Sequence, residues 1–121
     1  MQTLWVDPVD FSSTFPGGAE VIIVAGSGAT VRDLQYLRAS GGEAIIRRHL
    51  AKGGVLVGVC GGYQMFGQTI YDPLLRQGSQ SEIEGLGLLP IKTLFGPKLV
   101  SANTTATCLL AEDGAEPIKG E

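Results

Sequence analysis

The stretch VLVGVCGGYQMFG, residues 55–67, carries the residues most able to do chemistry. A run of β-forming aliphatic residues ends at Cys60, two glycines follow, and an amphipathic segment comes next. Gly58, Cys60 and Gly62 match G-x-C-x-G, the thiol form of the nucleophile elbow, in which a sharp strand-to-helix turn presents the nucleophile. We therefore predict a strained backbone at Cys60, with the two flanking glycines leaving room for it.

The surroundings of such a turn would suit a nucleophile for acyl transfer. A helix that begins after Cys60 directs free N–H groups and the positive end of its dipole at the sulfur, which favours the reactive thiolate. The N–H of Gly61 would then face a tetrahedral oxyanion. We expect a second donor from the turn Gly26-Ser27, because parallel strands place their sites at their carboxyl ends.

A structural role for the thiols is the alternative on pattern alone. Free cysteine is among the most buried residue types, and a G-x-C-x-G pentamer arises by chance in a chain with 18 glycines. Cys108 lies in an aliphatic and threonine-rich run, with no such turn around it. We predict that Cys108 is a buried structural residue.

The strands that must position Cys60 follow from the apolar patterning. Residues 20–25 (EVIIVA) and 55–59 are continuous runs of β-forming residues, which predict strands buried on both faces. Other patterns predict a loop over residues 71–84 and further strands over residues 4–6, 86–89, 91–95 and part of 99–110.

Two helices are expected between the two apolar strands. The first begins at Thr30, whose side chain would cap it, with Asp33 at the capping-box position. The second spans residues 43–52 and ends at Gly53-Gly54. Strands that alternate with helices predict a parallel sheet built from βαβ crossovers.

The composition sets the class of protein. The 121 residues are 44% hydrophobic and 17% charged, which predicts one folded domain with a packed core. A net charge of -3 gives no basic footprint for nucleic acid or an anionic membrane surface. We find no apolar run of membrane-spanning length and no signal peptide, and two cysteines are too few for a disulfide framework. We therefore expect a cytoplasmic protein.

Three longer segments resemble one enzyme family. GVCGGYQMFG, IEGLGLLPIKTLF and VIIVAGSGATVRDLQYLR are similar to the glutamine amidotransferase domain of the cobyric acid synthase type, and the likeness covers residues 5–95. It implies a three-layer, doubly wound and largely parallel α/β sheet (class I glutamine amidotransferase-like, flavodoxin-like), incomplete at both ends. Residues 1–121 would form a partial glutamine amidotransferase domain. A cell-wall amidotransferase relative shares the Gly-Tyr-Gln step and is a competing identification.

The resemblance implies roles for particular residues. Cys60 would attack the side-chain amide of glutamine, giving a γ-glutamyl thioester and ammonia. The backbone of Gly61 and of Gly26-Ser27 would form the oxyanion hole, and Gln64 would contact the substrate glutamine; the alternative for Gln64 is an exposed polar helix residue. Tyr63 and Met65 are expected to pack the helix.

The family also implies what lies outside this chain. A separate synthetase domain of the full-length enzyme would use ATP and Mg²⁺ to activate a corrinoid carboxylate, and ammonia would pass to it. In this chain we expect no cofactor and no metal site, because Gly26-Ser27-Gly28 lacks the Gly-Lys-Ser/Thr ending of a phosphate-binding loop. The expected partners are therefore glutamine and the synthetase domain.

Two departures from the family pattern matter. The turn Pro-Gly-Ser-Lys-Asn becomes Ala25-Gly26-Ser27-Gly28-Ala29, so the turn loses the proline that would preorganise it. The family histidine, which comes from a downstream motif resembling Gly-Tyr-Glu-Ile-His, has no counterpart. The single histidine, His49, is predicted to face solvent on a helix that runs toward the opposite edge of the sheet, so it is not expected to be the base.

The function predicted from sequence is therefore a glutaminase part of a cobyric acid synthase-type enzyme, inactive by itself because the histidine is missing. The alternatives are a catalytically dead scaffold or partner-binding module, a redox or stress protein with a reactive cysteine at the elbow, and a cell-wall amidotransferase subunit. Exposed sheet edges in an incomplete domain also predict self-association.

Overall fold

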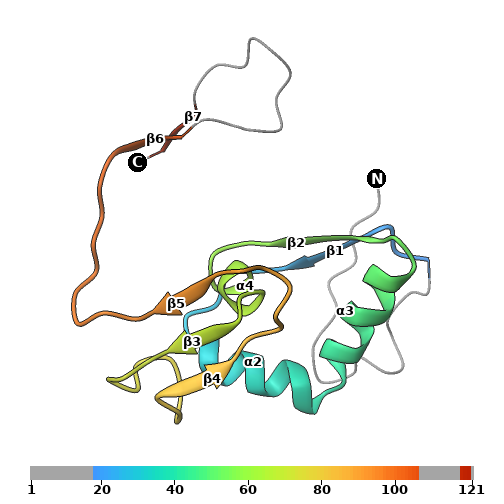
Figure 1. Cartoon of the computed structure of the whole chain (residues 1–121), viewed down its shortest axis with the longest axis horizontal. Coiled ribbons are helices and arrows are strands. Elements are labelled where there is room, and N and C mark those ends of the chain that lie inside the picture. Colours follow the sequence, from blue (N-terminus) through green and yellow to red (C-terminus); the bar gives the residue numbers. More distant parts are fainter. Residues whose placement is uncertain (1–17, 107–117, 121) are drawn as a thin grey trace.

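The computed structural model describes residues 18–106 and 118–120 (Figure 1). The predicted strand at residues 4–6 and Cys108 lie outside the described residues. The elements follow one another as β1 (Val21–Val24), α2 (Thr30–Ala39), α3 (Gly42–Ala51), β2 (Val55–Gly58), α4 (Gly61–Met65), β3 (Thr69–Tyr71), β4 (Glu82–Glu84), β5 (Lys92–Leu94), β6 (Thr104–Ala106) and β7 (Ile118–Gly120).

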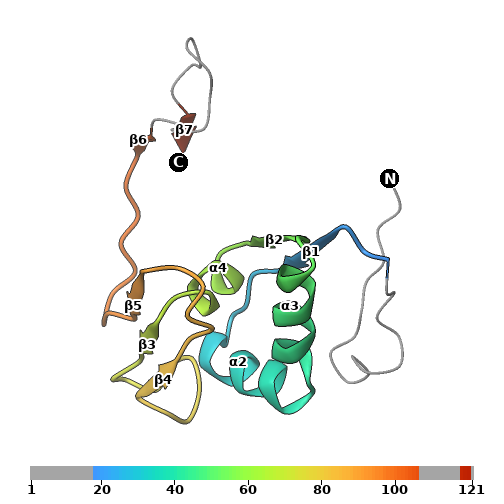
Figure 2. The ribbon, with the colours of Figure 1, turned by 45° about the vertical axis from the view of Figure 1, so that its right-hand side comes forward.

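Strands β1 and β2 form the parallel pair that the sequence predicts. Val21 pairs with Val55 and Val24 pairs with Gly58, so the two strands end side by side at their carboxyl ends. Helices α2 and α3 make the crossover between them and lie on one side of the pair (Figure 2). The carboxyl ends of β1 and β2 therefore present the Gly26-Ser27 turn and Cys60 at the same edge.

The prediction that these strands are buried on both faces is wrong for the described residues. Alternate side chains on the face away from the helices are 40–62% exposed, namely those of Val21, Ile23, Val55 and Val57. Side chains alternate between the faces of a strand, so the helices cover only one set. A continuous apolar run signals strand formation here, but not two covered faces.

The core lies between the helices and a second sheet. Val31, Leu34 and Leu37 line one face of α2 at three-residue spacing, and all three are buried. They belong to a buried cluster completed by Ile46, Met65, Phe66, Ile70, Ile83 and Leu86.

The second sheet is mixed and shorter than the predicted parallel sheet. Strand β3 pairs antiparallel with β4 and parallel with β5. A separate antiparallel pair joins β6 to β7. The parallel β1–β2 pair agrees with the expected α/β class, whereas the three-layer doubly wound sheet stays a prediction.

Residues 86–89 do not form the predicted strand. The backbone N–H of Leu86 donates to the carbonyl of Met65 at 2.7 Å, and those of Leu88 and Leu89 donate to Phe66 at 2.8 and 2.9 Å. These carbonyls belong to the end of α4, where a helix leaves acceptors without partners. The N–H groups of this segment therefore bond the free carbonyls at the end of α4 instead of pairing with a strand.

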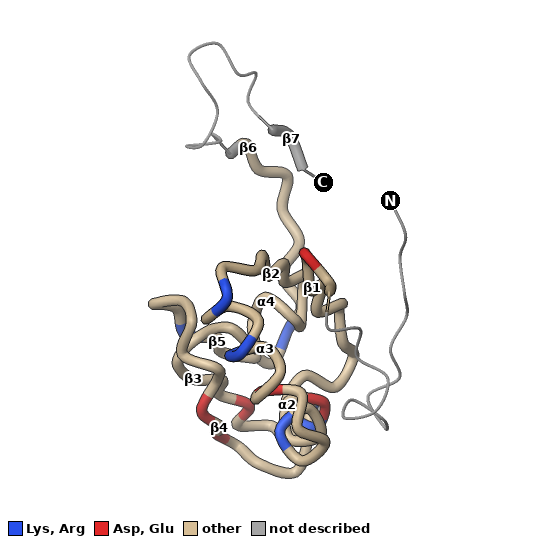
Figure 3. Tube along the Cα trace, turned by 90° about the vertical axis from the view of Figure 1, so that its right-hand side faces the viewer, with Lys and Arg blue, Asp and Glu red and all other residues tan. Residues whose placement is uncertain are grey.

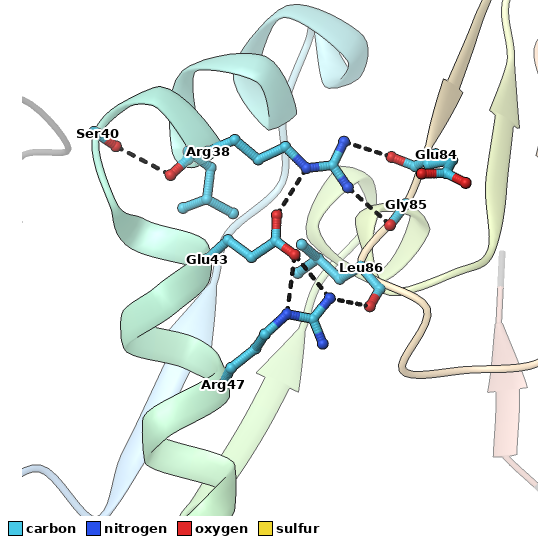
Figure 4. A network of polar contacts seen from close by, with 8 residues as sticks. Arg38, Ser40, Glu43, Arg47, Glu84, Gly85 and Leu86 are labelled. Atoms are coloured by element: carbon cyan, nitrogen blue, oxygen red, sulfur yellow. Dashed lines mark hydrogen bonds and ion pairs between the residues drawn. The ribbon is translucent and has the colours of Figure 1, made fainter.

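An ionic network joins the two long helices to the end of β4 and the residues that follow it (Figure 4). Arg38 donates to the carboxylate of Glu43 at 2.7 Å and to the carbonyls of Glu84 and Gly85 at 2.7 and 2.9 Å. Arg47 donates to the other oxygen of Glu43 and to the carbonyl of Leu86. Acidic and basic positions are interspersed over α2 and α3 (Figure 3).

Candidate active site

Cys60 lies at the sharp turn between β2 and α4. Its φ is 52° and its ψ is −112°, and it precedes the first residue of α4. A non-glycine residue in such a conformation costs on the order of 1–3 kcal/mol. The residue is exposed, so its thiol is accessible to a ligand. The strained turn predicted at Cys60 is therefore confirmed, and the alternative of a buried Cys60 is wrong.

The flanking glycines permit the close packing of this turn. A Cβ atom on Gly58 would lie 2.5 Å from the Phe66 ring and 2.8 Å from the backbone N of Tyr63. A Cβ atom on Gly62 would overlap the carbonyl of Val24 at the end of β1. Glycine at both positions therefore lets α4 approach the two strands, as the G-x-C-x-G spacing predicts.

The Gly26-Ser27 turn lies directly beside Cys60 and Gly61. A Cβ atom on Gly26 would lie 3.4 Å from Cβ of Cys60, and one on Gly61 would lie 2.9 Å from the backbone N of Ser27. The backbones that carry the two predicted oxyanion donors are thus adjacent. Their juxtaposition is confirmed, whereas their role as an oxyanion hole stays a prediction.

Side-chain hydrogen bonds hold this turn, which lacks the proline of the family motif. The hydroxyl of Ser27 accepts the N–H of Ala29 at 2.9 Å and donates to the carboxylate of Asp33 on α2. The predicted capping by Thr30 is wrong, because Ala29 is the N-cap residue and Thr30 is already helical. Asp33 consequently anchors Ser27 instead of completing a capping box.

Gln64 reaches the same edge from α4. Its side chain is half-buried, and its Oε1 accepts a hydrogen bond from the hydroxyl of Thr30 at 3.4 Å. Met65 is 3% exposed and packs in the core as predicted. Tyr63 is 47% exposed, so the expectation that it packs the helix is wrong.

His49 has a structural place at the far end of β2. It is 9% exposed, and its Nε2 lies 2.9 Å from the carbonyl of Val55, the first residue of the strand. The prediction that it faces solvent is wrong, because Gly54 has no side chain and leaves room for the imidazole. The four residues of β2 rise about 10 Å before Cys60 is reached, so His49 is not placed to act on the sulfur.

Two residues near the site were not singled out from the sequence. Asp72 is fully buried after β3, and Gln77 bonds the first turn of α2. An Asp-Pro dipeptide in a loop rich in glutamine and serine is the one local signal, and it marks a turn without showing what the turn contacts.

The described part of the chain holds no group of three or more His, Cys, Asp or Glu side chains arranged to hold a metal ion. Over residues 18–106 and 118–120, no helix is both long and apolar enough to cross a lipid bilayer.

Comparison of the sequence with known proteins identifies its family. The model of the CobB/CobQ-like glutamine amidotransferase domain matches residues 5–120. The chain is 41% identical to the cobyric acid synthase of Rhizobium rhizogenes over 87% of its length, which is 21% of that relative. It is 39% identical to the cobyric acid synthase of Brucella canis over 89% of its length, which is 22% of that relative.

A third relative, the cobyric acid synthase of Sphingopyxis alaskensis, is 45% identical over 76% of this chain and 19% of the relative. The chain thus spans about a fifth of the length of the curated relatives it matches. No solved structure matches it significantly. The match over residues 5–120 shows that the chain belongs to the CobB/CobQ-like glutamine amidotransferase domain family.

Proposed function

We propose that this chain is the glutaminase part of a cobyric acid synthase-type amidotransferase. It would hydrolyse glutamine and supply ammonia for amidation of a corrinoid carboxylate in cobalamin biosynthesis. The observation that carries the proposal is the exposed Cys60 thiol on a strained turn, with the backbones of Gly61 and Ser27 beside it. Membership of a glutamine amidotransferase family supports glutamine as the substrate.

The proposed reaction uses groups that converge at the edge of β1 and β2. The sulfur of Cys60 attacks the side-chain amide carbon of glutamine, and the N–H groups of Gly61 and Ser27 stabilise the negative charge on its oxygen. The carbon–nitrogen bond breaks, ammonia leaves, and water hydrolyses the thioester to glutamate. Gln64, held by the hydroxyl of Thr30, would contact the substrate.

A proton donor and acceptor for these steps is not supplied by His49, the one histidine in the sequence. Loss of a catalytic base typically lowers kcat by several orders of magnitude. We therefore expect this chain by itself to hydrolyse glutamine weakly or not at all. Amidation would need the synthetase domain of a full-length enzyme, with ATP and Mg²⁺ used there, and a cytoplasmic location is part of the proposal.

Covalent labelling tests the glutamine site without requiring the histidine. A diazoketone analogue of glutamine should alkylate Cys60, with loss of dinitrogen, and the mass of the Cys60 peptide should rise accordingly. Glutamine should slow the reaction, whereas asparagine, one methylene shorter, should not. The Cys60→Ser variant is the control that should lose the label. Labelling that glutamine does not slow would contradict the proposal.

A further inference from the structure

We propose that the loop of residues 72–78, which we call the Asp72 loop, positions the oxyanion turn of the candidate site through Gln77. Asp72 and Gln77 are positioning residues in this account, since neither would touch the substrate. The inference rests on the proposed function, because it assigns the loop a role in the reaction of Cys60 with a glutamine-like ligand.

A fully buried side chain shapes the Asp72 loop. One carboxylate oxygen of Asp72 accepts the N–H of Arg76 at 3.0 Å, and the other accepts the N–H of Gln77 at 2.6 Å. The backbone of Asp72 adds a bond from Leu75 and one to Ser81. Aspartate side chains commonly fix turns through bonds of this kind. The position of the Gln77 backbone is therefore set by Asp72.

Gln77 supplies the cap that α2 does not take from its own N-cap residue. Its Oε1 accepts the N–H of Thr30 at 3.1 Å, and its carbonyl accepts the N–H of Arg32 at 3.1 Å. The first N–H groups of a helix have no partner within the helix, and Ala29 has no side chain that could accept them. Gly78 lets the loop lie close, because a Cβ atom there would come within 2.9 Å of Val31.

The first turn of α2, which Gln77 caps, also contacts the residues of the candidate site. The hydroxyl of Thr30 bonds Gln64, and a Cβ atom on Gly61 would lie 3.0 Å from that hydroxyl. Asp33 bonds the hydroxyl of Ser27. A displacement of the first turn of α2 would therefore shift the N–H of Ser27 relative to the N–H of Gly61, and small misplacements of catalytic groups slow reactions strongly.

Substitutions at Gln77 separate this role from simple support of the fold. Gln77→Ala should lower the maximal rate constant of diazoketone labelling at Cys60 by roughly tenfold or more. Gln77→Glu should retain the rate, because its carboxylate still accepts the N–H of Thr30. Alkylation of Cys60 by iodoacetamide, which needs no oxyanion hole, should be equal in all variants. Gln80→Ala, at an exposed position three residues further on, is the matched control.

Each outcome decides a different claim. If the unaltered chain shows no glutamine-sensitive labelling, the proposed function fails. If the unaltered chain does show glutamine-sensitive labelling, two results would overturn the positioning role. One is a labelling rate for Gln77→Ala equal to that of the unaltered chain, and the other is a rate for Gln77→Glu as low as that for Gln77→Ala. Should Gln77→Ala not fold, hydrogen exchange on the unaltered chain decides: protected amides at Thr30 and Arg32 support the cap, and exchange as fast as in an open loop overturns it.

Discussion

The backbone of Cys60, with φ 52° and ψ −112°, is unfavourable for any residue that has a side chain. Tight packing of Gly58 and Gly62 against neighbouring backbone and side chains holds it there. The strained turn presents the sulfur, and its conformation lowers the stability of the folded chain at the proposed nucleophile.

Replacement of Cys60 tests the strain directly. Cys60→Gly should have a free energy of unfolding about 1 kcal/mol higher than Cys60→Ala, because glycine adopts positive φ without steric cost. Urea denaturation of the two variants measures the difference. The same pair at Ser40, whose φ is −82°, should favour alanine. Equal stabilities for the two Cys60 variants would show that the turn is not strained.

Local sequence was sufficient to predict part of the site. Glycines in the sequence mark where the two parallel strands end. The placement of Cys60 beside the Gly26-Ser27 turn follows from these strand ends. The surroundings of Thr30 and His49 could not be predicted in this way. The N–H of Thr30 is bonded by the side chain of Gln77, which is 47 residues away in the sequence. The burial of His49 depends on the space that Gly54 leaves by having no side chain.

Among the elements, local patterns located β1, β2 and the helices, but the loop predicted over residues 71–84 is wrong at its two ends, where β3 ends at Tyr71 and β4 spans Glu82–Glu84. The apolar runs located β1 and β2, and the three-residue spacing located the buried face of α2. Residues 86–89 have the composition of a strand, yet their N–H groups bond the end of α4. The partner of residues 86–89 is a segment distant in the sequence, so the composition of these four residues alone could not predict it.

Glu43 links α2 and α3 and makes this link sensitive to pH. Burial raises the pKa of the Glu43 carboxyl, but hydrogen bonds from Arg38 and Arg47 and their charges outweigh it, so the pKa lies below its ordinary value. A lowered pKa in the folded state stabilises the protein above the ordinary glutamate pKa of about 4.3. This contribution is lost as the pH falls through the folded-state value.

We therefore expect Glu43→Gln to lower the free energy of unfolding by about 1–2 kcal/mol at neutral pH, because a neutral amide would pair more weakly with the two guanidinium groups than the carboxylate does. The difference from the unaltered chain should shrink below about pH 4. Denaturant titrations at several pH values measure it, with Glu82→Gln, at an exposed position in β4, as the control. A difference that stays constant down to about pH 3, well below the ordinary glutamate pKa, would contradict this role.

For the whole molecule, the uncovered face of β1 and β2 is an apolar feature of the surface that the described residues form. Ile23 is 62% exposed and Val55 is 54% exposed, next to Val21 and Val57 on the same face. Contiguous apolar surface of this kind promotes association.

We expect the chain to self-associate through this face. The weight-average mass from sedimentation equilibrium should rise with concentration, and Ile23→Thr should reduce the rise. Leu74→Thr changes a residue that is 50% exposed but lies away from β1 and β2, so it should not reduce the rise in mass. A monomer over the whole concentration range would show that the face stays uncovered in solution.

The most direct test of the account compares the two cysteines within one sample. After brief exposure to the diazoketone, peptide mapping by mass spectrometry gives the labelling rates of Cys60 and Cys108 side by side. We predict that Cys60 reacts at least about tenfold faster, because the strained turn presents its sulfur and the adjacent N–H groups of Gly61 and Ser27 would hold the carbonyl oxygen of the diazoketone. Equal rates would contradict the account and favour an inert scaffold; selective oxidation of Cys60 by peroxide without diazoketone labelling would favour a redox role.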